Sequence, residues 1–372
     1  MKFKKTLIGG GIVLVLVAGL VLESMISAGV FRSIEPHFAG QCTRVEGVVG
    51  AEDITIDPET GMAYISAMDR RTLIATGEHR GGIYIYRPGS FATPIKFETD
   101  LKGPFHPHGI DLWKAPDDSG DNGGDSGVND RIFVVTHPIA PGKNGEPGTP
   151  VSQVDIFDIK GDRLAHVRAV KPVEPVSLND VAAAGPDSFF ASIDKGSVTP
   201  LGRTLETYGR LARAGVMYGK GGRMSRAAWD MVYANGLQVS PDGKTLYVAE
   251  TTGKRLSSHS ISPIDGLLTQ VAETRINSGL DNIEFDAGGD LWVVGHPKTF
   301  DFLAHAGDAA KRSPSQVFKV VWENGNMVAE EIYLNDGNPI SGASVAAPAT
   351  TSTGDRLLIG SVFEPFILDC SL

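Results

Sequence analysis

Six times along the chain an apolar run, a turn built on Pro, Asp or Gly, and a second apolar run follow one another. Strand-turn-strand units that recur while the residues between them diverge are typical of a repeat architecture. They recur about every 55 residues, near the ~40–50 residues of a four-stranded propeller blade with its loops. The pattern therefore predicts an all-β, six-bladed β-propeller over residues 41–372. The six units begin near Ile54, Gly109, Val181, Leu237, Ile283 and Val345.

The N-terminal segment departs from this pattern, because the basic MKFKK precedes an apolar run at residues 7–22. Such a pair is typical of a signal peptide or a signal anchor. The run is shorter than the ~20 residues that span a bilayer comfortably, and Glu23 and Met25 interrupt the place of a small-residue cleavage site. Both interpretations export the chain. We favour an uncleaved membrane anchor and short linker in residues 1–40 over a cleaved signal, which would leave a periplasmic or extracellular protein.

The stretch 199–220 is the second departure, because its apolar side chains recur at helical spacing: Leu205, Tyr208, Leu211 and Ala212. It predicts an amphipathic helix over one face of the propeller. There are two interpretations of this helix. It is a lid packed on its own blade, or it forms a functional surface, namely a wall of the active-site mouth or a face directed at a membrane. An acidic, Gly-rich insert at 115–130 lengthens the second repeat.

Charge and cysteine content narrow the function classes. A net charge of −10 and a pI of about 5.4 argue against nucleic acid as a partner, because phosphate binding needs clustered Lys and Arg. The chain has two cysteines, Cys42 and Cys370, one at each end of its globular part. In an exported chain they favour a disulfide over isolated buried thiols, and a ring brings its first and last blades together.

Oxygen-bearing side chains stand immediately in front of four of the six repeats. Equivalent positions converge on the axis of a ring, and Ca²⁺ takes about 6–8 oxygens from carboxylates, amides and water. Any single Asn or Asp pair in front of a repeat could be a turn former, but the recurrence favours a calcium site. Zinc is a poor fit because no cysteine is among these residues. Asp53 and Asp180 could hold a second, deeper ion. The candidate ligands of the first ion are Glu52, Asn179, Asn235, Asp281 and Asn282.

Three histidines in comparable places offer a general base: His108, His137 and His296. The last two precede Pro, which forces an extended exit and places both rings at strand ends. A histidine there is commonly a structural hydrogen-bonding group, but beside a calcium-bound carbonyl it would deprotonate an attacking water. No Gly-x-Ser-x-Gly motif occurs, which argues against a serine esterase, and no Gly-rich loop carries the Lys of a phosphate site.

With these motifs in view, the chain resembles the paraoxonase/arylesterase family. The resemblance covers nearly the whole chain from Cys42 onward, including both cysteines. It implies a six-bladed, calcium-dependent propeller with lactonase and arylesterase activity, that is, a carboxylic ester hydrolase. The segments that carry it are VEGVVGAEDITIDPETGMAYIS, PHGIDLW, SLNDVAAAGPDSFFAS, YANGLQVSPDGKTLYVAE, LDNIEFDAGGDLWVVGHP and LLIGSVFEPFILDCSL.

The resemblance also assigns roles to individual residues. It implies two Ca²⁺ ions, a catalytic one on the five ligands named above and a structural one on Asp53, Asp180 and the backbone carbonyl of Ile110. It further implies a dyad of His108 and His137, with His296 as another active-site histidine.

Two segments depart from the family pattern, the 115–130 insert and the loosely matching 199–220, and both bear on specificity more than on mechanism. The chain has no Asn-x-Ser/Thr glycosylation motif.

We therefore expect a hydrolase of lactones and aryl esters in which calcium polarises the carbonyl and His108, oriented by His137, activates water. Two alternatives share the architecture. One is a sugar-lactonase or strictosidine-synthase-like propeller, and the other is a non-catalytic propeller in which calcium merely clamps the ring. The His108/His137 pair and the five oxygen donors favour the first function.

Overall fold

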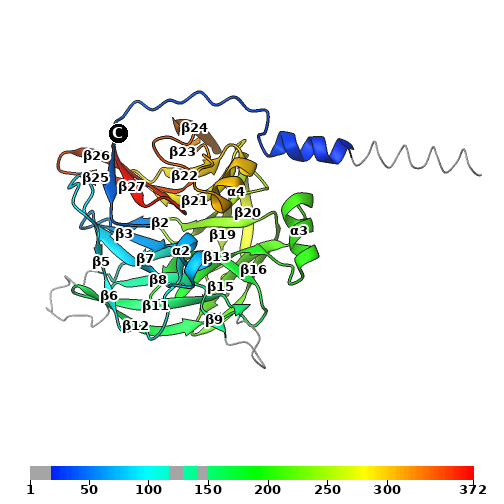
Figure 1. Ribbon diagram of the computed structural model, residues 1–372. Coiled ribbons are helices and arrows are strands. Elements are labelled where there is room, and N and C mark those ends of the chain that lie inside the picture. Colours follow the sequence, from blue (N-terminus) through cyan, green and yellow to red (C-terminus); the bar gives the residue numbers. More distant parts are fainter. Residues whose placement is uncertain (1–17, 117–128, 141–148) are drawn as a thin grey trace, which may run out of the picture.

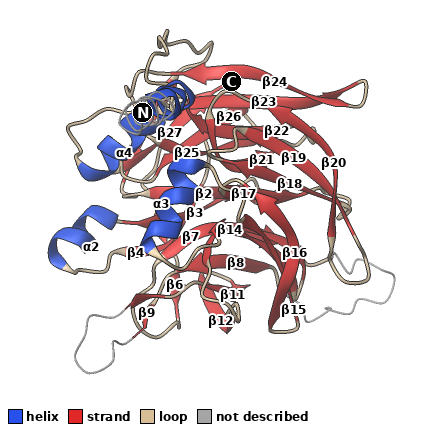
Figure 2. Cartoon of the chain, turned by 90° about the vertical axis from the view of Figure 1, so that its right-hand side faces the viewer, coloured by secondary structure: helices blue, strands red, loops and turns tan. Residues whose placement is uncertain are grey.

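The computed structural model describes residues 18–116, 129–140 and 149–372. Within these residues, six β-sheets surround a common axis as the blades of a propeller (Figure 1, Figure 2). One edge strand of each sheet lies innermost, and these innermost strands contact one another in ring order. The predicted six-bladed β-propeller is thus confirmed.

The blades follow one another along the chain. From the axis outward, blade 1 contains β2 (Ala51–Ile56), β3 (Ala63–Met68), β4 (Gly81–Tyr86) and β5 (Ile95–Lys96). Blade 2 contains β7 (Pro107–Trp113), β8 (Arg131–Thr136), β11 (Gln153–Lys160), β12 (Arg163–Val170) and β6 (Glu98–Thr99). Blade 3 contains β13 (Ser177–Gly185), β14 (Ser188–Lys195), β15 (Ala214–Lys220) and β16 (Arg223–Met231).

The second half of the ring is built in the same way. Blade 4 contains β17 (Ala234–Val239), β18 (Thr245–Glu250), β19 (Arg255–Ile261) and β20 (Leu268–Arg275). Blade 5 contains β21 (Gly279–Phe285), β22 (Leu291–His296), β23 (Gln316–Glu323) and β24 (Asn326–Leu334). Blade 6 contains β25 (Ala343–Thr351), β26 (Gly354–Ser361), β27 (Phe366–Ser371) and β1 (Cys42–Glu46), and β9 (Ile139–Ala140) and β10 (Thr149–Pro150) form a separate ribbon.

The turns between the two innermost strands of a blade follow from their Asp and Gly residues. In blade 1, Asp57 Oδ1 accepts a hydrogen bond from the Glu59 amide at 2.9 Å, and Gly61 has φ 67°. In blade 5, Asp286 Oδ1 accepts from the Gly288 amide at 2.9 Å, and Gly289 has φ 87°. Asp side chains stabilise such turns locally, and glycine adopts a positive φ without strain.

The apolar side chains pack between blades. Each of six buried apolar clusters among the described residues joins two neighbouring blades. Phe133 of blade 2, for example, lies against Phe189 of blade 3 with ring centroids 5.6 Å apart. The alternation along each strand therefore buries both faces of a blade, and burial of this apolar surface is the main stabilising term of the fold.

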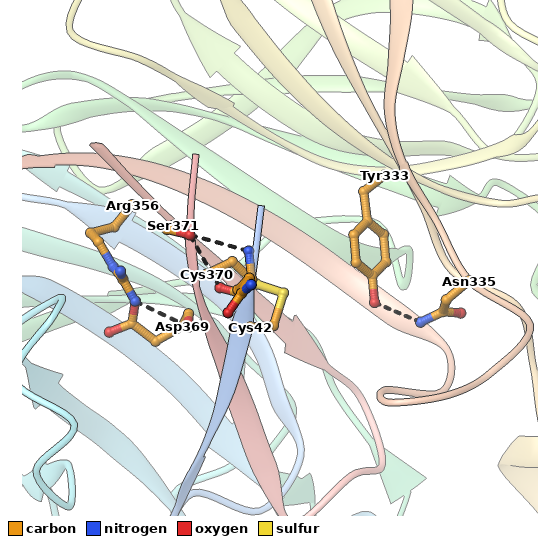
Figure 3. Close-up of a disulfide and its surroundings, with 8 residues drawn as sticks. Cys42, Tyr333, Asn335, Arg356, Asp369, Cys370 and Ser371 are labelled. Carbon is orange, nitrogen blue, oxygen red and sulfur yellow. Dashed lines mark hydrogen bonds and ion pairs between the residues drawn. A yellow bond between two sulfur atoms is a disulfide. The ribbon is translucent and has the colours of Figure 1, made fainter. Parts of the chain in front are cut away.

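The ring closes where the start of the globular part meets its end. Strand β1 pairs antiparallel with β27, with Cys42 opposite Cys370. The expected disulfide joins these two residues across 328 positions of sequence (Figure 3). Beside it, the buried Asp369 accepts hydrogen bonds from Arg356 Nε at 2.7 Å and from the Tyr86 hydroxyl of blade 1 at 2.6 Å.

The described helices gather on one side of the propeller (Figure 2). They are an N-terminal helix over residues 18–27 and the helices α2 (Arg70–Thr76), α3 (Pro200–Gly209) and α4 (Thr299–Gly307). Arg210, at the end of α3, pairs with Glu23 of the N-terminal helix and donates to Ser27 Oγ at 3.1 Å. This contact holds the N-terminal helix beside α3.

The helix predicted over 199–220 is shorter than expected. Thr199 caps α3 through a hydrogen bond from the Gly202 amide at 3.1 Å, Pro200 is its first residue, and Arg210 ends it with a left-handed φ of 50°. Residues 214–220 instead form β15, because their side chains fill the blade between β14 and β16. Tertiary pairing thus overrides the helical spacing of the sequence.

Two other sequence features fall largely outside the described residues. The basic segment and most of the apolar run of the expected signal or anchor lie in residues 1–17, and most of the 115–130 insert lies in residues 117–128. Among the helices that are described, none combines the length and the apolar character that a membrane crossing requires.

Candidate metal centre

Every innermost strand carries a β-bulge near its first residues, and the predicted oxygen donors lie at these bulges. A bulge places an extra residue in one strand and changes the direction of its side chains. The donors therefore lie inside strands, which corrects the expectation that they stand in front of them. The register shifts fall at residues 51–53, 107–110, 178–181, 234–237, 280–283 and 343–345.

The five predicted ligands are buried side chains with exposed fractions between 1% and 8%. Hydrogen bonds place several of them side by side. Asn282 Nδ2 donates to the Glu52 carbonyl at 3.1 Å, and Asn235 Nδ2 donates to Asp281 Oδ1 at 2.7 Å and to Thr251 Oγ1 at 3.0 Å. The amide nitrogens of Asn282 and Asn235 are thereby tied to groups on other blades or strands.

Several side-chain oxygens of the same residues lack a hydrogen-bond partner. Four of them are buried and have no hydrogen-bond partner in the described part of the chain: Glu52 Oε2, Asn179 Oδ1, Asn235 Oδ1 and Asn282 Oδ1. Buried acceptors without a partner are costly and rare in proteins. A set of amide and carboxylate oxygens with two negative charges is the donor chemistry that Ca²⁺ prefers. These residues therefore fit a hard divalent cation.

The electrostatics agree with this assignment. Burial raises the pKa of Glu52 well above its usual range, and the neighbouring Asp53 raises it further. Burial likewise raises the pKa of Asp53 to about 7, although two backbone amides lower it. Carboxylates crowded together in this way favour a bound cation. Among the described residues, no three or more His, Cys, Asp or Glu side chains are grouped so that they alone could hold a metal ion.

Asp53 and Asp180 each join two blades through backbone amides. Asp53 accepts from Ile54 at 2.9 Å and from Ile110 of blade 2 at 2.8 Å. Asp180 accepts from the amides of Val181 and of Leu237 in blade 4, both at 2.7 Å. Ile110 thus lies next to Asp53, and its amide contacts that carboxylate.

Asp111 makes the same kind of connection and was missed by the sequence analysis. Its carboxylate accepts from Leu112 at 2.8 Å and from Ala183 of blade 3 at 2.7 Å. The sequence signal that could have identified Asp111 is its position in GIDLW, two residues after the start of the second repeat.

Gly109 allows the innermost strands to approach this closely. A Cβ atom at Gly109 would stand 2.1 Å from Asp180 Oδ1, a distance that no real side chain tolerates. A Cβ at Gly236 would likewise stand 2.5 Å from the Asp281 carbonyl oxygen. Glycine at these bulges is therefore required by the close passage of the next blade.

His108 lies against the oxygen cluster. Its Nε2 is 3.3 Å from Glu52 Oε1, and its Nδ1 is 3.1 Å from Arg70 Nη2. Because a guanidinium only donates, Nδ1 accepts and the ring is neutral with its hydrogen on Nε2. Burial and then the charge of Arg70 lower the pKa of His108 well below its usual range.

His137 follows β8 and meets His108 edge to ring face, with centroids 5.2 Å apart and planes at 86°. Its hydrogen bond goes instead to Ser152, where Nδ1 and Oγ are 3.2 Å apart. Burial lowers the pKa of His137 to about 4. The structure thus brings the two predicted histidines together but gives each a different hydrogen-bond partner.

His296, the last residue of β22, is buried behind Asp281. Its Nε2 is 2.8 Å from Asp281 Oδ2, and its ring lies 4.0 Å from the ring of Phe302 in α4. His296 therefore holds one oxygen of the buried Asp281 carboxylate.

Sequence reasoning also missed Arg70 and a second histidine pair. His106 stacks on His79 with ring centroids 4.6 Å apart, and its Nδ1 is 3.1 Å from the His137 carbonyl oxygen. These residues stand in or beside the segment that contains α2, which has no counterpart in the repeat pattern. The FHPHG sequence around His108 was the one available signal.

The predicted lid lines a pocket beside this centre. Thr207 and Tyr208 of α3, Ser27 of the N-terminal helix and Phe300 of α4 contribute to it. The pocket extends to Thr251, whose hydroxyl accepts the hydrogen bond from Asn235. The segment thus packs on its own blade, where Glu206 accepts from the Gly196 amide at 2.9 Å, and also lines a pocket next to the candidate site.

The fold and the site together define a six-bladed propeller with unpaired, buried oxygens at its axis. A family model described as Arylesterase matches residues 104–372, and the chain belongs to this family of carboxylic ester hydrolases. Serum paraoxonase/arylesterase 2 of Rattus norvegicus is 29% identical over 96% of this chain and 96% of the relative. Serum paraoxonase/arylesterase 1 of Homo sapiens is 26% identical over 90% of this chain and 89% of the relative.

Solved structures of other proteins share the fold. A luciferin-regenerating enzyme is 13% identical, with a TM-score of 0.52 over 90% of this chain and 96% of that chain. The PQQ-bound aldose sugar dehydrogenase of Streptomyces coelicolor is also 13% identical, with a TM-score of 0.50 over 91% of this chain and 99% of that chain. At these identities the likeness concerns the fold alone.

Proposed function

We propose that this protein is a calcium-dependent hydrolase of lactones and aryl esters. The observation that carries the proposal is the set of four buried side-chain oxygens without a partner at the axial bulges. Membership of the arylesterase family supports the reaction class.

A first Ca²⁺ ion would be held by the oxygens of five residues: Glu52, Asn179, Asn235, Asp281 and Asn282. Bound there, calcium supplies the positive charge that polarises the ester carbonyl. Asp281 is kept in place by Asn235 on one oxygen and by His296 on the other.

A second, structural Ca²⁺ ion would use Asp53, Asp180 and the carbonyl of Ile110. The two carboxylates lie close enough that the charge of Asp53 raises the pKa of Asp180 further, after burial has raised it well above its usual range. These carboxylates already join blades 1 to 2 and 3 to 4, so an ion between them would strengthen the ring.

His108 would act as the general base toward water. Its neutral ring is the form that accepts a proton. Both nitrogens are engaged in the structure, Nδ1 by Arg70 and Nε2 by Glu52, so one contact has to open before the proton moves. His137, packed edge-on beside it, would keep the ring of His108 in its place.

Export from the cytoplasm would complete this assignment. The disulfide between Cys42 and Cys370 is the observation that supports it, because disulfides persist in oxidising compartments. The N-terminal segment would then serve as an anchor or a signal.

The experiment is turnover of phenyl acetate and δ-valerolactone before and after exhaustive removal of calcium, with bound calcium counted by atomic emission. We expect both activities to disappear on chelation and to return on calcium addition, with about two ions per chain. Turnover that persists in calcium-free protein would contradict the proposal. A protein that binds calcium and turns over neither substrate would point to the clamp role instead.

A further inference from the structure

Arg70 is a cation of the candidate site that has no anionic partner among the described residues. It is the first residue of α2, whose cap is Asp69 through a hydrogen bond from the Thr72 amide at 2.9 Å. Its Nη2 donates to His108 Nδ1 at 3.1 Å, whereas its Nη1 is buried and has no hydrogen-bond partner among the described residues. No described carboxylate lies within ion-pair distance of this guanidinium.

The neighbouring Arg71, by contrast, makes the contacts of a structural arginine. Arg71 Nη1 donates to the Phe363 carbonyl at 2.8 Å, Nη2 donates to the His305 carbonyl, and the guanidinium covers the Phe363 ring at 4.8 Å. Arg71 thus fastens α2 to the propeller. Within the described part of the chain, Arg70 makes no such contact with the propeller, and its Nη1 donor has no partner there.

The charges around the site indicate which kind of ligand the free Nη1 donor of Arg70 would bind. Burial lowers the pKa of Arg70, and the attraction of Glu52 and Asp281 raises it, so these two carboxylates are its nearest source of negative charge. A divalent cation on Glu52 and Asp281 would neutralise both of them. The guanidinium would then be a buried charge without compensation, which is costly unless an anion arrives.

We propose that Arg70 binds the acyl oxygens of the ligand, and that the site therefore has an anion subsite for the carboxylate of the product acid. This inference rests on the proposed function, because hydrolysis of an ester or lactone leaves a carboxylate next to the oxygen cluster. A planar guanidinium with one free Nη, and a second one shared with His108, matches two carboxylate oxygens. The same donor meets the oxygen that gains negative charge as water adds to the carbonyl.

The test measures binding of 5-hydroxypentanoate, the product acid of δ-valerolactone, to the calcium-loaded protein by calorimetry. We expect Arg70→Met to weaken this binding about 10- to 100-fold, because a charge-assisted hydrogen bond is lost. Arg70→Lys keeps the charge without the planar pair of donors and should lose about 3- to 10-fold. Neither variant should alter binding of the neutral 1,5-pentanediol.

Arg80→Met is the matched control, because it removes an exposed guanidinium that pairs with Glu78 at 2.7 Å, outside the site. It should bind the carboxylate as the wild type does. Wild-type affinity in Arg70→Met would overturn the proposal, and lost turnover with retained carboxylate affinity would leave Arg70 only a positioning role toward His108. If Arg70→Met does not fold, Arg70→Lys decides by the same affinity.

The outcomes also separate this proposal from the proposed function. A protein that binds 5-hydroxypentanoate through Arg70 but hydrolyses no ester supports the anion subsite and removes the hydrolase. A protein that hydrolyses esters with equal carboxylate affinity in all variants supports the hydrolase and removes the subsite.

Discussion

Asn282 of blade 5 donates a hydrogen bond from Nδ2 to the backbone carbonyl of Glu52 in blade 1 at 3.1 Å, although blade 6 stands between these blades. Ser344 of blade 6 donates to the same carbonyl at 2.7 Å. Three blades therefore meet at one oxygen atom. The bond shows that side chains from distant repeats reach each other across the axis, and it leaves the amide oxygen of Asn282 free for a cation.

Replacement of Asp281 by Asn tests the metal centre, because it removes one of two carboxylates from the proposed ligand set. We expect calcium affinity to fall by about tenfold or more, since affinity depends on the number of charged ligands. Esterase activity should disappear at calcium concentrations that saturate the wild type. Calcium titration of both proteins checks this, and Asp242→Asn in the exposed turn of blade 4 is the control that should change neither. Equal affinity in Asp281→Asn would rule this residue out as a ligand.

Removal of the disulfide should destabilise the protein and leave its site intact. The bridge connects strands β1 and β27 at a separation of 328 residues, so it restricts the unfolded chain over almost its whole length. The variant Cys42→Ala/Cys370→Ala should lose about 2–5 kcal/mol of unfolding free energy. Denaturant titration measures the loss, and reduced wild-type protein should behave in the same way. Unchanged stability, or a lower calcium content, would contradict the assignment.

Replacement of His108 by Gln tests the proposed base. Turnover of phenyl acetate should fall by about 10²–10⁴-fold, the usual contribution of general-base catalysis. Calcium content should not change, because His108 is not among the oxygen donors. His137→Gln should cost less, since that ring packs beside the base without taking the proton. Steady-state kinetics with calcium analysis decide this, and wild-type turnover in His108→Gln would make the histidine structural.

The buried His259 of blade 4 gives a pH dependence that is independent of the metal. Its Nε2 is 2.9 Å from Ser257 Oγ, and burial, together with the charge of Arg255, lowers its pKa from 6.5 to about 4. The unfolded chain then binds this proton more readily than the folded one, so stability is complete above pH 6.5 and declines as the pH falls toward 4. The decline from this group amounts to roughly 3 kcal/mol at most.

The matched variant His259→Gln removes this titration and keeps a hydrogen-bonding group for Ser257. We expect the difference in unfolding free energy between wild type and variant to shrink as the pH is lowered from 7.5 to 5. Urea titrations at several pH values provide the measurement. A difference that stays constant over this range would mean that His259 titrates as it does in the unfolded chain.

Much of the ring was predictable from the sequence, because propeller blades are local. Outside blade 2, where the 115–130 insert intervenes, each pair of inner strands is joined by a short turn with Asp or Gly in it or beside it, so the signals of a pair lie within about 15 residues of one another. The helix over 199–220 was predicted too long for the opposite reason. Residues 214–220 become a strand only because they pair antiparallel with β14 on one side and β16 on the other.

By itself the sequence determined the number of blades, the pairing of its two cysteines and the oxygen-bearing residues that recur before the repeats. These features depend on local turns and on the symmetry of a ring. Only the tertiary structure decided that the donors lie at bulges inside strands, that the amide nitrogens of Asn235 and Asn282 are engaged while their oxygens are not, and that Arg70 reaches His108. Those outcomes depend on contacts between segments far apart in sequence, such as α2 and β7, whose meeting is set by the packing of whole blades.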